Sequence, residues 1–238
     1  MFQFVCILII SILFAVILKK PLKRFPWVFY IIALALDALL VASFTVTFPR
    51  HLQTLILFPL QRCYIALSLF AIVMFIGVFS NKSRIKAYLI PIRAELSILA
   101  CILTLAHIIR HVSNYLPRLF SDTVRMILPN YMSIIIALLI SALMLLLGVT
   151  SFKAIRERMS ATAWKRIQRF AYPFFILIYV HLGLFLLPST LHGGTAALEN
   201  FVIYTVIFLT YSVFRIRKAF IDRHTHRHYN QDTDISKV

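Results

Sequence analysis

The hydrophobic positions of the chain form seven long runs that are separated by short polar connections. An apolar helix needs about 20 residues to cross the hydrocarbon core of a bilayer, with roughly 17–25 acceptable. The connections are too short to bury a hydrophobic core of their own. The pattern therefore predicts an all-α polytopic membrane helix bundle with about seven transmembrane helices, at 2–18, 27–47, 62–79, 93–112, 131–151, 166–187 and 198–216.

The composition supports this prediction. The chain is 61% hydrophobic and only 14% charged, whereas a soluble domain is usually about 45–50% apolar and about 25% charged. The net charge of +17 comes from Lys and Arg in short clusters between the apolar runs, and not from one basic face. We therefore exclude nucleic acid as a partner and expect a multi-pass protein of the cell inner (cytoplasmic) membrane, in contact with lipid.

The basic residues also predict an orientation, because cytoplasmic connections carry an excess of Lys and Arg. Of the 25 basic residues, 20 lie in the first, third and fifth connections and in the tail, and five lie on the opposite side. We expect the N-terminus outside and the C-terminus in the cytoplasm. The first run has no basic residues before it and no small-residue cleavage motif, so we expect it to be a retained span and not a signal peptide.

Two histidines within the predicted spans point to chemistry, because polar groups inside a membrane are costly. His107 lies 14 residues after Arg93 and His181 lies 15 residues after Arg166, which is roughly 21 and 22 Å along a helix that rises 1.5 Å per residue. Both spans run outward, so the two histidines have the same depth on different helices. This arrangement suits axial ligation of a heme. The alternative is that each imidazole bonds a neighbouring helix or a buried water. His111 lies one turn beyond His107 and is either another ligand, a propionate partner with Arg110, or an interfacial residue, which we favour.

Two stretches of the chain resemble the ferric reductase-like transmembrane family, and in particular the heme-binding membrane subunit of the bacterial periplasmic methionine-sulfoxide reductase system. The matching segments are RAEL at 93–96 leading to LAH at 105–107, and WKRIQRFAY at 164–172 leading to YVH at 179–181. The resemblance covers roughly residues 62–216. It implies a b-type heme held by His107 and His181, and electron transfer across the membrane.

The resemblance also bears on the number of hemes and on the domain organisation. Where relatives are expected to have a further histidine, this chain has Gln168. The inner positions are thus Arg93 and Gln168, which are not usual heme ligands, so we expect one heme. The predicted organisation is an additional N-terminal transmembrane helix with a basic loop at 1–26, a ferric reductase-like heme-binding bundle at 27–218, and a cytoplasmic basic, His-containing tail at 219–238.

A single heme in the outer half of the membrane needs an electron donor on the inner side. The chain has no GxGxxG or P-loop motif, so we expect no NAD(P)H- or FAD-binding domain of its own. Two electron donors remain as alternatives. One is a flavin such as FMN docked at the basic rim of Arg93, Lys165, Arg166 and Arg169, and the other is a membrane quinol. We expect an electron-transfer subunit of an oxidoreductase system, with a cytoplasmic flavoprotein or quinol as donor and an extracytoplasmic redox protein as acceptor.

The competing hypothesis is a cofactor-free membrane transporter or scaffold. It would use Asp37, Arg93 and Glu95 as a buried charge network. In either hypothesis we expect Asp37 to pair with a basic group such as Arg93 or Arg62, and the alternative is that Asp37 carries a proton linked to quinol oxidation. The tail histidines His224, His226 and His228 could bind a transition metal, although a solvated tail is the simpler interpretation.

Overall fold

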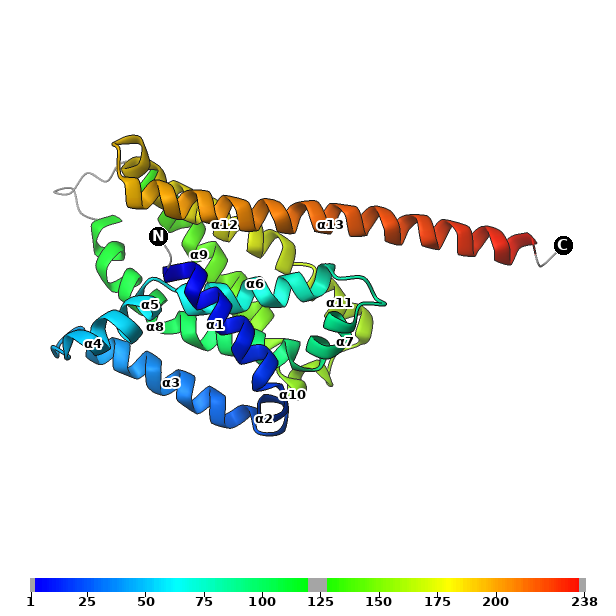
Figure 1. Cartoon of the computed structure of the whole chain (residues 1–238), viewed down its shortest axis with the longest axis horizontal. Helices are drawn as coiled ribbons and strands as arrows, with labels where there is room; N and C mark the ends of the chain where they lie inside the picture. The colour runs from blue at the N-terminus through cyan, green and yellow to red at the C-terminus, as the bar shows by residue number, and fades with distance from the viewer. Residues whose placement is uncertain (1–2, 120–127, 236–238) are drawn as a thin grey trace.

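The computed structural model describes residues 3–119 and 128–235, and every element in these ranges is helical (Figure 1). The prediction of an all-α fold is therefore confirmed for this part of the chain. The side chains of the tail histidines lie outside the described residues, and so do those of Arg118, Arg125 and Lys237, which are among the basic residues counted for the orientation. The elements are α1 (Gln3–Ile17), α2 (Lys19–Arg24), α3 (Pro26–Ala42), α4 (Arg50–Leu52), η1 (Gln53–Leu57), α5 (Phe58–Gln61), α6 (Tyr64–Val78), α7 (Arg84–Leu89), η2 (Ile90–Ile92), α8 (Arg93–Leu119), α9 (Leu128–Val149), α10 (Lys153–Arg156), α11 (Ala161–Gln168), α12 (Ala171–Leu191) and α13 (Thr195–Ile235).

The chain is a multi-pass membrane protein by the length and composition of its helices. Within the described ranges four helical stretches are long and apolar enough to span a membrane: Arg84–Tyr115, Leu128–Val149, Ala161–Leu191 and Thr195–Asp222. A fifth is formed if Arg50–Gln61 and Tyr64–Val78, which are bent by 47°, count as one span. Every predicted run overlaps a helix, but the run 27–47 extends beyond the end of α3 at Ala42, and α1 and α3 have only 15 and 17 residues. The count of seven spans thus stays a prediction.

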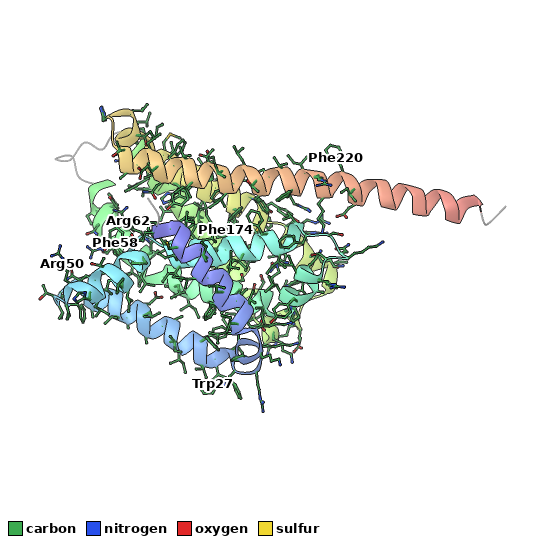
Figure 2. All side chains as sticks on the ribbon, in the orientation of Figure 1. Trp27, Arg50, Phe58, Arg62, Phe174 and Phe220 are labelled. Atoms are coloured by element: carbon green, nitrogen blue, oxygen red, sulfur yellow. The ribbon has the colours of Figure 1, made fainter. Side chains whose placement is uncertain are left out.

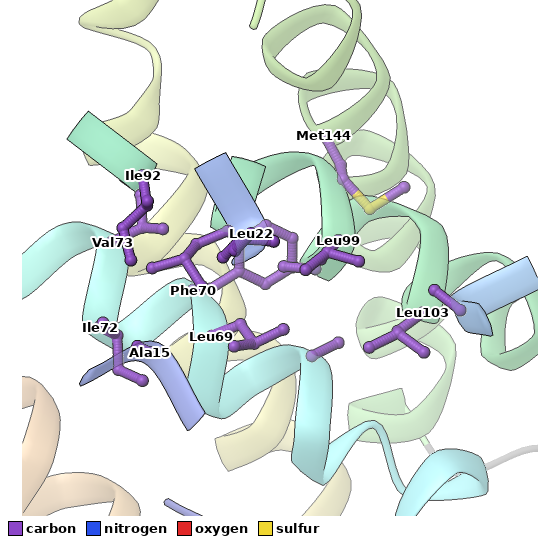
Figure 3. Packing of buried hydrophobic residues seen from close by; sticks show 14 of the residues in the cluster. Ala15, Leu22, Leu69, Phe70, Ile72, Val73, Ile92, Leu99, Leu103 and Met144 are labelled. Atoms are coloured by element: carbon purple, nitrogen blue, oxygen red, sulfur yellow. The ribbon is translucent and has the colours of Figure 1, made fainter. Parts of the chain in front are cut away.

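Helix α6 forms the centre of the bundle. It is apolar on all sides, and nearly all of its side chains are buried, as expected for a helix surrounded by others. Figure 3 shows its residues Leu69, Phe70 and Val73 packed against Leu99 and other apolar side chains from the neighbouring helices. The outer helices instead expose many large apolar side chains, which suits contact with lipid.

Four helices form a closed ring around the region that concerns function. α6 contacts α8, α8 contacts α9, α9 contacts α12, and α12 contacts α6. α3 covers α8, α1 covers α6, and α13 packs along α12. The α12–α13 hairpin turns at Gly193, whose φ of 80° is in the left-handed region that glycine adopts without a Cβ penalty and that often ends a helix. The ring places α8 and α12 across from each other.

The basic connections gather at one end of the bundle. In Figure 1 the short helices α2, α7, α10 and α11 lie at the end opposite α4 and α5. This arrangement agrees with the grouping of basic connections on one side. Which side faces the cytoplasm stays a prediction. At the same end, α13 continues through the predicted boundary at 218–219 without a break and extends beyond the bundle (Figure 1).

Candidate functional site

His107 is held by a backbone carbonyl that a break in the neighbouring span leaves free. Its Nδ1 lies 2.6 Å from the carbonyl oxygen of Gln61, the last residue of α5. The final carbonyls of a helix have no partner within that helix and must find one elsewhere. His107 on α8 supplies this partner, so the break in the α5–α6 segment sets the orientation of the imidazole.

The break itself has a local cause in the backbone. Cys63 has a φ of 59°, a left-handed conformation that is uncommon for a residue with a side chain and that ends the run of helical hydrogen bonds before α6 begins. A turn of π-helix at Gln53–Leu57 and Pro59 precede it, and such turns are frequent near functional sites. The guanidinium of Arg62 lies 4.3 Å from the centre of the Phe58 ring, and the two side chains are seen together at this end of the bundle (Figure 2).

His181 on α12 is held in a similar way by α9. Its Nδ1 lies 3.0 Å from the backbone oxygen of Ser133 and 2.8 Å from the hydroxyl oxygen of the same residue. The Ser133 hydroxyl donates to the backbone oxygen of His181 at 3.2 Å. Ser133 is fully buried, so these bonds are shielded from water. The imidazole ring of His181 is therefore fixed by a single residue, Ser133, of the neighbouring helix α9.

These contacts determine the tautomer of both histidines. A carbonyl oxygen only accepts hydrogen bonds, so Nδ1 of His107 and Nδ1 of His181 must carry the proton. Each Nε2 then keeps its lone pair. A histidine that ligates a metal usually donates its other ring N–H to a carbonyl or carboxylate in this way. Both residues thus have the tautomer that an axial ligand requires, and they fit a heme in this respect.

The two histidines are also brought together by a series of ring contacts. The rings of His107 and His111 lie 4.3 Å apart, His111 stacks on Tyr115 at 5.6 Å, Tyr115 meets Phe185 at 6.4 Å, and Phe185 lies 6.5 Å from His181. These contacts link α8 to α12 near the two histidines, and the equal depth of His107 and His181 stays a prediction. Within the described ranges, no group of three or more His, Cys, Asp or Glu is placed to hold a bare metal ion.

The remaining outer candidates have other contacts. The guanidinium of Arg110 lies 4.4 Å from the centre of the Phe44 ring. Its role beside a heme propionate stays a prediction. His111 stacks on the ring of Tyr115 and has no carbonyl partner like that of His107 among the described residues. Of the two histidines on α8, His107 is the one with the features of a ligand.

The predicted charge network is not formed among the residues that the structure describes. Neither carboxylate oxygen of Asp37 has a hydrogen-bond partner, and Oε2 of Glu95 also has none. Arg93 donates from Nε to the backbone oxygen of Val73 at 3.3 Å, and Arg62 donates to the hydroxyl of Tyr64 at 3.4 Å. The expectation that Asp37 pairs with either arginine is therefore wrong: these guanidinium groups donate to a backbone oxygen and to a tyrosine hydroxyl instead.

Arg93 and Gln168 come together at the end of the bundle where the basic connections gather, which is the predicted inner end. Both line a cavity of about 290 Å³, together with Lys86 and Arg215. Of the four residues predicted to form a basic rim, only Arg93 lines this cavity. The other three, Lys165, Arg166 and Arg169, are exposed.

Sequence reasoning missed four contributors to these sites. Lys86 and Arg215 belong to clusters that the orientation rule already explained, so they carried no separate signal. Ser133 is a polar residue in an apolar span, which is a signal, but Ser141 on the same helix gives an equal one. Gln61 acts through its backbone, and only the preceding Pro59 hints at a break.

Comparison with known proteins supports the resemblance drawn from the sequence. Residues 62–179 match the ferric reductase like transmembrane component family. The chain is also similar to an uncharacterized protein of Treponema pallidum (strain Nichols), with 42% identity over 164 residues. That match covers 69% of this chain and 45% of the relative, so the chain spans less than half the length of the relative. No solved structure matches the chain.

The matched segment contains α6, α8, α9 and the first part of α12, so it includes residues from all four helices of the ring. It includes His107 and ends two residues before His181. This match to the ferric reductase like transmembrane component family covers about half of the chain and points to membrane electron transfer in general.

Proposed function

We propose that the protein binds one heme b between α8 and α12 and transfers electrons across the membrane. The observation that carries the proposal is the pair of Nδ1 contacts to the backbone oxygens of Gln61 and Ser133, at 2.6 and 3.0 Å. These contacts leave one Nε2 lone pair on His107 and one on His181, and the two residues lie on helices that face each other across the four-helix ring. His107 and His181 would hold the iron, which when bound supplies one-electron redox chemistry.

The protein residues supply ligation, orientation and an apolar environment. His107 and His181 would each offer one Nε2 atom to the iron, one from α8 and one from α12. The Ser133 and Gln61 contacts keep the imidazole rings from rotating, since a ring that turned would lose a buried hydrogen bond. Arg110 is the candidate to neutralise a propionate, and His111 remains interfacial in this proposal.

The direction of transfer follows from the predicted orientation. Electrons would come from a cytoplasmic flavin or a membrane quinol and pass to an extracytoplasmic acceptor protein, so that the donor is oxidised and the acceptor reduced. The protein would lie in the inner membrane and act as one component of an oxidoreductase system. The absence of an inner histidine at Arg93 and Gln168 supports one heme and not two.

The test is a visible spectrum of the purified protein in detergent, reduced with dithionite and compared with the oxidised form. We expect a sharp b-type band and about one heme per chain in a pyridine hemochrome assay. The variants His107→Ala and His181→Ala should each lose the heme. His192→Ala, which changes an exposed histidine in the α12–α13 turn, is the matched control and should retain it.

Two results would contradict the proposal. A His181→Ala variant with full heme content would remove the residue from the ligand pair. Wild-type protein without heme, after expression with ample heme supply, would favour the cofactor-free transporter or scaffold. Two hemes per chain would keep the function but show that a further ligand exists.

A further inference from the structure

The cavity at the inner end of the bundle has a strongly positive lining. It measures about 290 Å³, and the charged side chains that line it are Lys86, Arg93 and Arg215. No carboxylate lines it among the described residues. The carboxylate of Asp222, further along α13 and outside the lining, is close enough to Lys86 to interact with it electrostatically. Three cations that share one partly buried space repel one another, so an anion in the cavity would be stabilised.

A second pair of contacts increases this concentration of positive charge. The ammonium groups of Lys86 and Lys218 both approach the side-chain oxygen of Asn81, at 2.6 and 3.5 Å. Lys218 also donates to the backbone oxygen of Phe79 at 2.8 Å. Two ammonium groups thus share one neutral acceptor at the edge of the cavity, where no carboxylate of the lining offsets their charge.

Arg93 has donors left over for a ligand. Its hydrogen bond among the described residues goes from Nε to the backbone oxygen of Val73, at 3.3 Å. The N–H groups on Nη1 and Nη2 remain available, and they form the planar fork that binds phosphate in a bidentate manner. Gln168 is held from the other side, since its Nε2 donates to the hydroxyl of Thr150 at 3.3 Å.

The rest of the lining suits the organic part of an ester. Tyr211 is almost fully buried, and the guanidinium of Arg215 lies 4.5 Å from the centre of the Tyr172 ring. The volume is at the lower end of the roughly 300–1,000 Å³ that ligand pockets occupy. It therefore suits a headgroup or a mononucleotide better than an enclosed dinucleotide.

We propose that this cavity binds a phosphate ester, with the phosphate on Arg93, Lys86 and Arg215 and the organic part against Tyr172 and Tyr211. The site is separate from the histidine pair, because Arg93 precedes His107 by 14 residues, roughly 21 Å along α8. A phosphate ester could reach this cavity as part of either of two kinds of molecule. They are the headgroup of an anionic phospholipid, which basic cavities between cytoplasmic helix ends are known to bind, and a soluble phosphate ester such as FMN. The soluble source would deepen the proposed function, since it would supply the flavin donor.

The experiment measures both sources on the full-length protein in detergent. Flavin fluorescence reports the binding of FMN, with riboflavin as the probe that lacks the phosphate. Native mass spectrometry reports the binding of phosphatidylglycerol, with phosphatidylcholine as the zwitterionic probe. We expect one molecule of FMN or of phosphatidylglycerol per chain, and much weaker binding of its partner probe.

The variants test the residues of the cavity. Arg93→Gln and Arg215→Gln should each weaken binding about tenfold or more, because each loses a charge-assisted contact to phosphate. Arg169→Gln is the matched control, since Arg169 is exposed and lies next to Gln168 but outside the lining. Size-exclusion profiles and melting temperatures show that each variant is folded. If Arg93→Gln does not fold, the binding measurement uses Arg215→Gln, whose substitution lies on the long α13 helix.

The outcomes are distinct from those of the heme test. Binding of FMN alone assigns the soluble source, and binding of phosphatidylglycerol alone assigns the lipid. The proposal is overturned if neither probe binds, or if Arg93→Gln and Arg215→Gln bind as tightly as Arg169→Gln. Heme content is measured separately and does not enter this result, so loss of one conclusion leaves the other standing.

Discussion

The replacement Ser133→Ala tests how the protein holds His181. It removes a hydroxyl whose oxygen lies 2.8 Å from Nδ1 of His181 and that donates to the His181 backbone oxygen at 3.2 Å. The backbone oxygen of Ser133 remains 3.0 Å from Nδ1. The imidazole therefore keeps its tautomer but loses one of its two partners on α9, and we expect the variant to bind heme more weakly without losing it.

The size of the effect follows from the energy of one hydrogen bond between helices. Such bonds contribute about 0.6 kcal/mol on average and at most about 1.7 kcal/mol in a membrane protein. At about 1.4 kcal/mol for each factor of ten, the dissociation constant for heme should rise about threefold to twentyfold. Ser133 is fully buried, so water cannot replace the hydroxyl, and we expect the upper part of this range.

The assay is the rate at which heme passes from the detergent-solubilised protein to excess apomyoglobin. The matched control is Ser141→Ala on the same helix, because the Ser141 hydroxyl donates to the backbone oxygen of Ala137 at 2.8 Å, within α9 itself. We expect faster heme loss from Ser133→Ala only. Equal rates in the two variants, or complete loss of heme from Ser133→Ala, would refute the reasoning about the second partner.

Three further predictions follow from other parts of the structure. His111→Ala should retain heme in a pyridine hemochrome assay, because its ring lacks the carbonyl contact of His107; loss of heme would make His111 a ligand. Gly148→Ala should lower stability by about 1–3 kcal/mol by overpacking the α8–α9 contact, because the new Cβ would lie 2.8 Å from Sγ of Cys101. Thermal unfolding should show that Cys101→Ala restores part of this loss, and a purely additive double variant would argue against the clash. A fluorescent protein fused to the C-terminus should fold and fluoresce while an alkaline phosphatase fusion stays inactive, and the opposite pattern would reverse the predicted orientation.

The unpartnered carboxylate of Asp37 distinguishes this bundle from one stabilised by buried ion pairs. Asp37 is 7% exposed, and neither of its oxygens has a hydrogen-bond partner among the described residues. Among the described residues, Lys153 and Glu157 form an ion pair at 3.7 Å. Both side chains are largely exposed, so the pair contributes little to stability. Cohesion of the bundle therefore rests on apolar packing around α6 and on hydrogen bonds to backbone oxygens.

The helical architecture could be predicted from the sequence because the bilayer restricts the choice of structure. A backbone in hydrocarbon must satisfy its own hydrogen bonds, so each apolar run of suitable length has to be helical. Each of the seven predicted runs overlaps a helix, although the run 27–47 extends past the end of α3 and the run 166–187 crosses the break between α11 and α12. The helix ends were less predictable: α8 continues past 112 to Leu119 and α13 past 216 to Ile235, because polar residues outside an apolar run are as compatible with helix as with coil.

The candidate histidines could also be found in the sequence, since the rise of a helix converts spacing into depth. The spacing predicts His107 and His181 at the same level. Ring contacts through His111, Tyr115 and Phe185 link their two helices, and the equal level itself stays a prediction. The sequence likewise identified Arg93 and Gln168 as inner positions. It determined which residues share a depth, because depth depends only on position along one helix.

Only the tertiary structure decided how these residues are held and what surrounds them. The Gln61 carbonyl reaches His107 across 46 positions of sequence, and the Ser133 contacts reach His181 across 48. The inner cavity combines Lys86 and Arg93 with Arg215, which is more than a hundred residues further along the chain. Depth is set by the helical rise within each span, but rotation and neighbours are set by packing between spans, and no periodicity within a single helix records which carbonyl or cation lies on the next one.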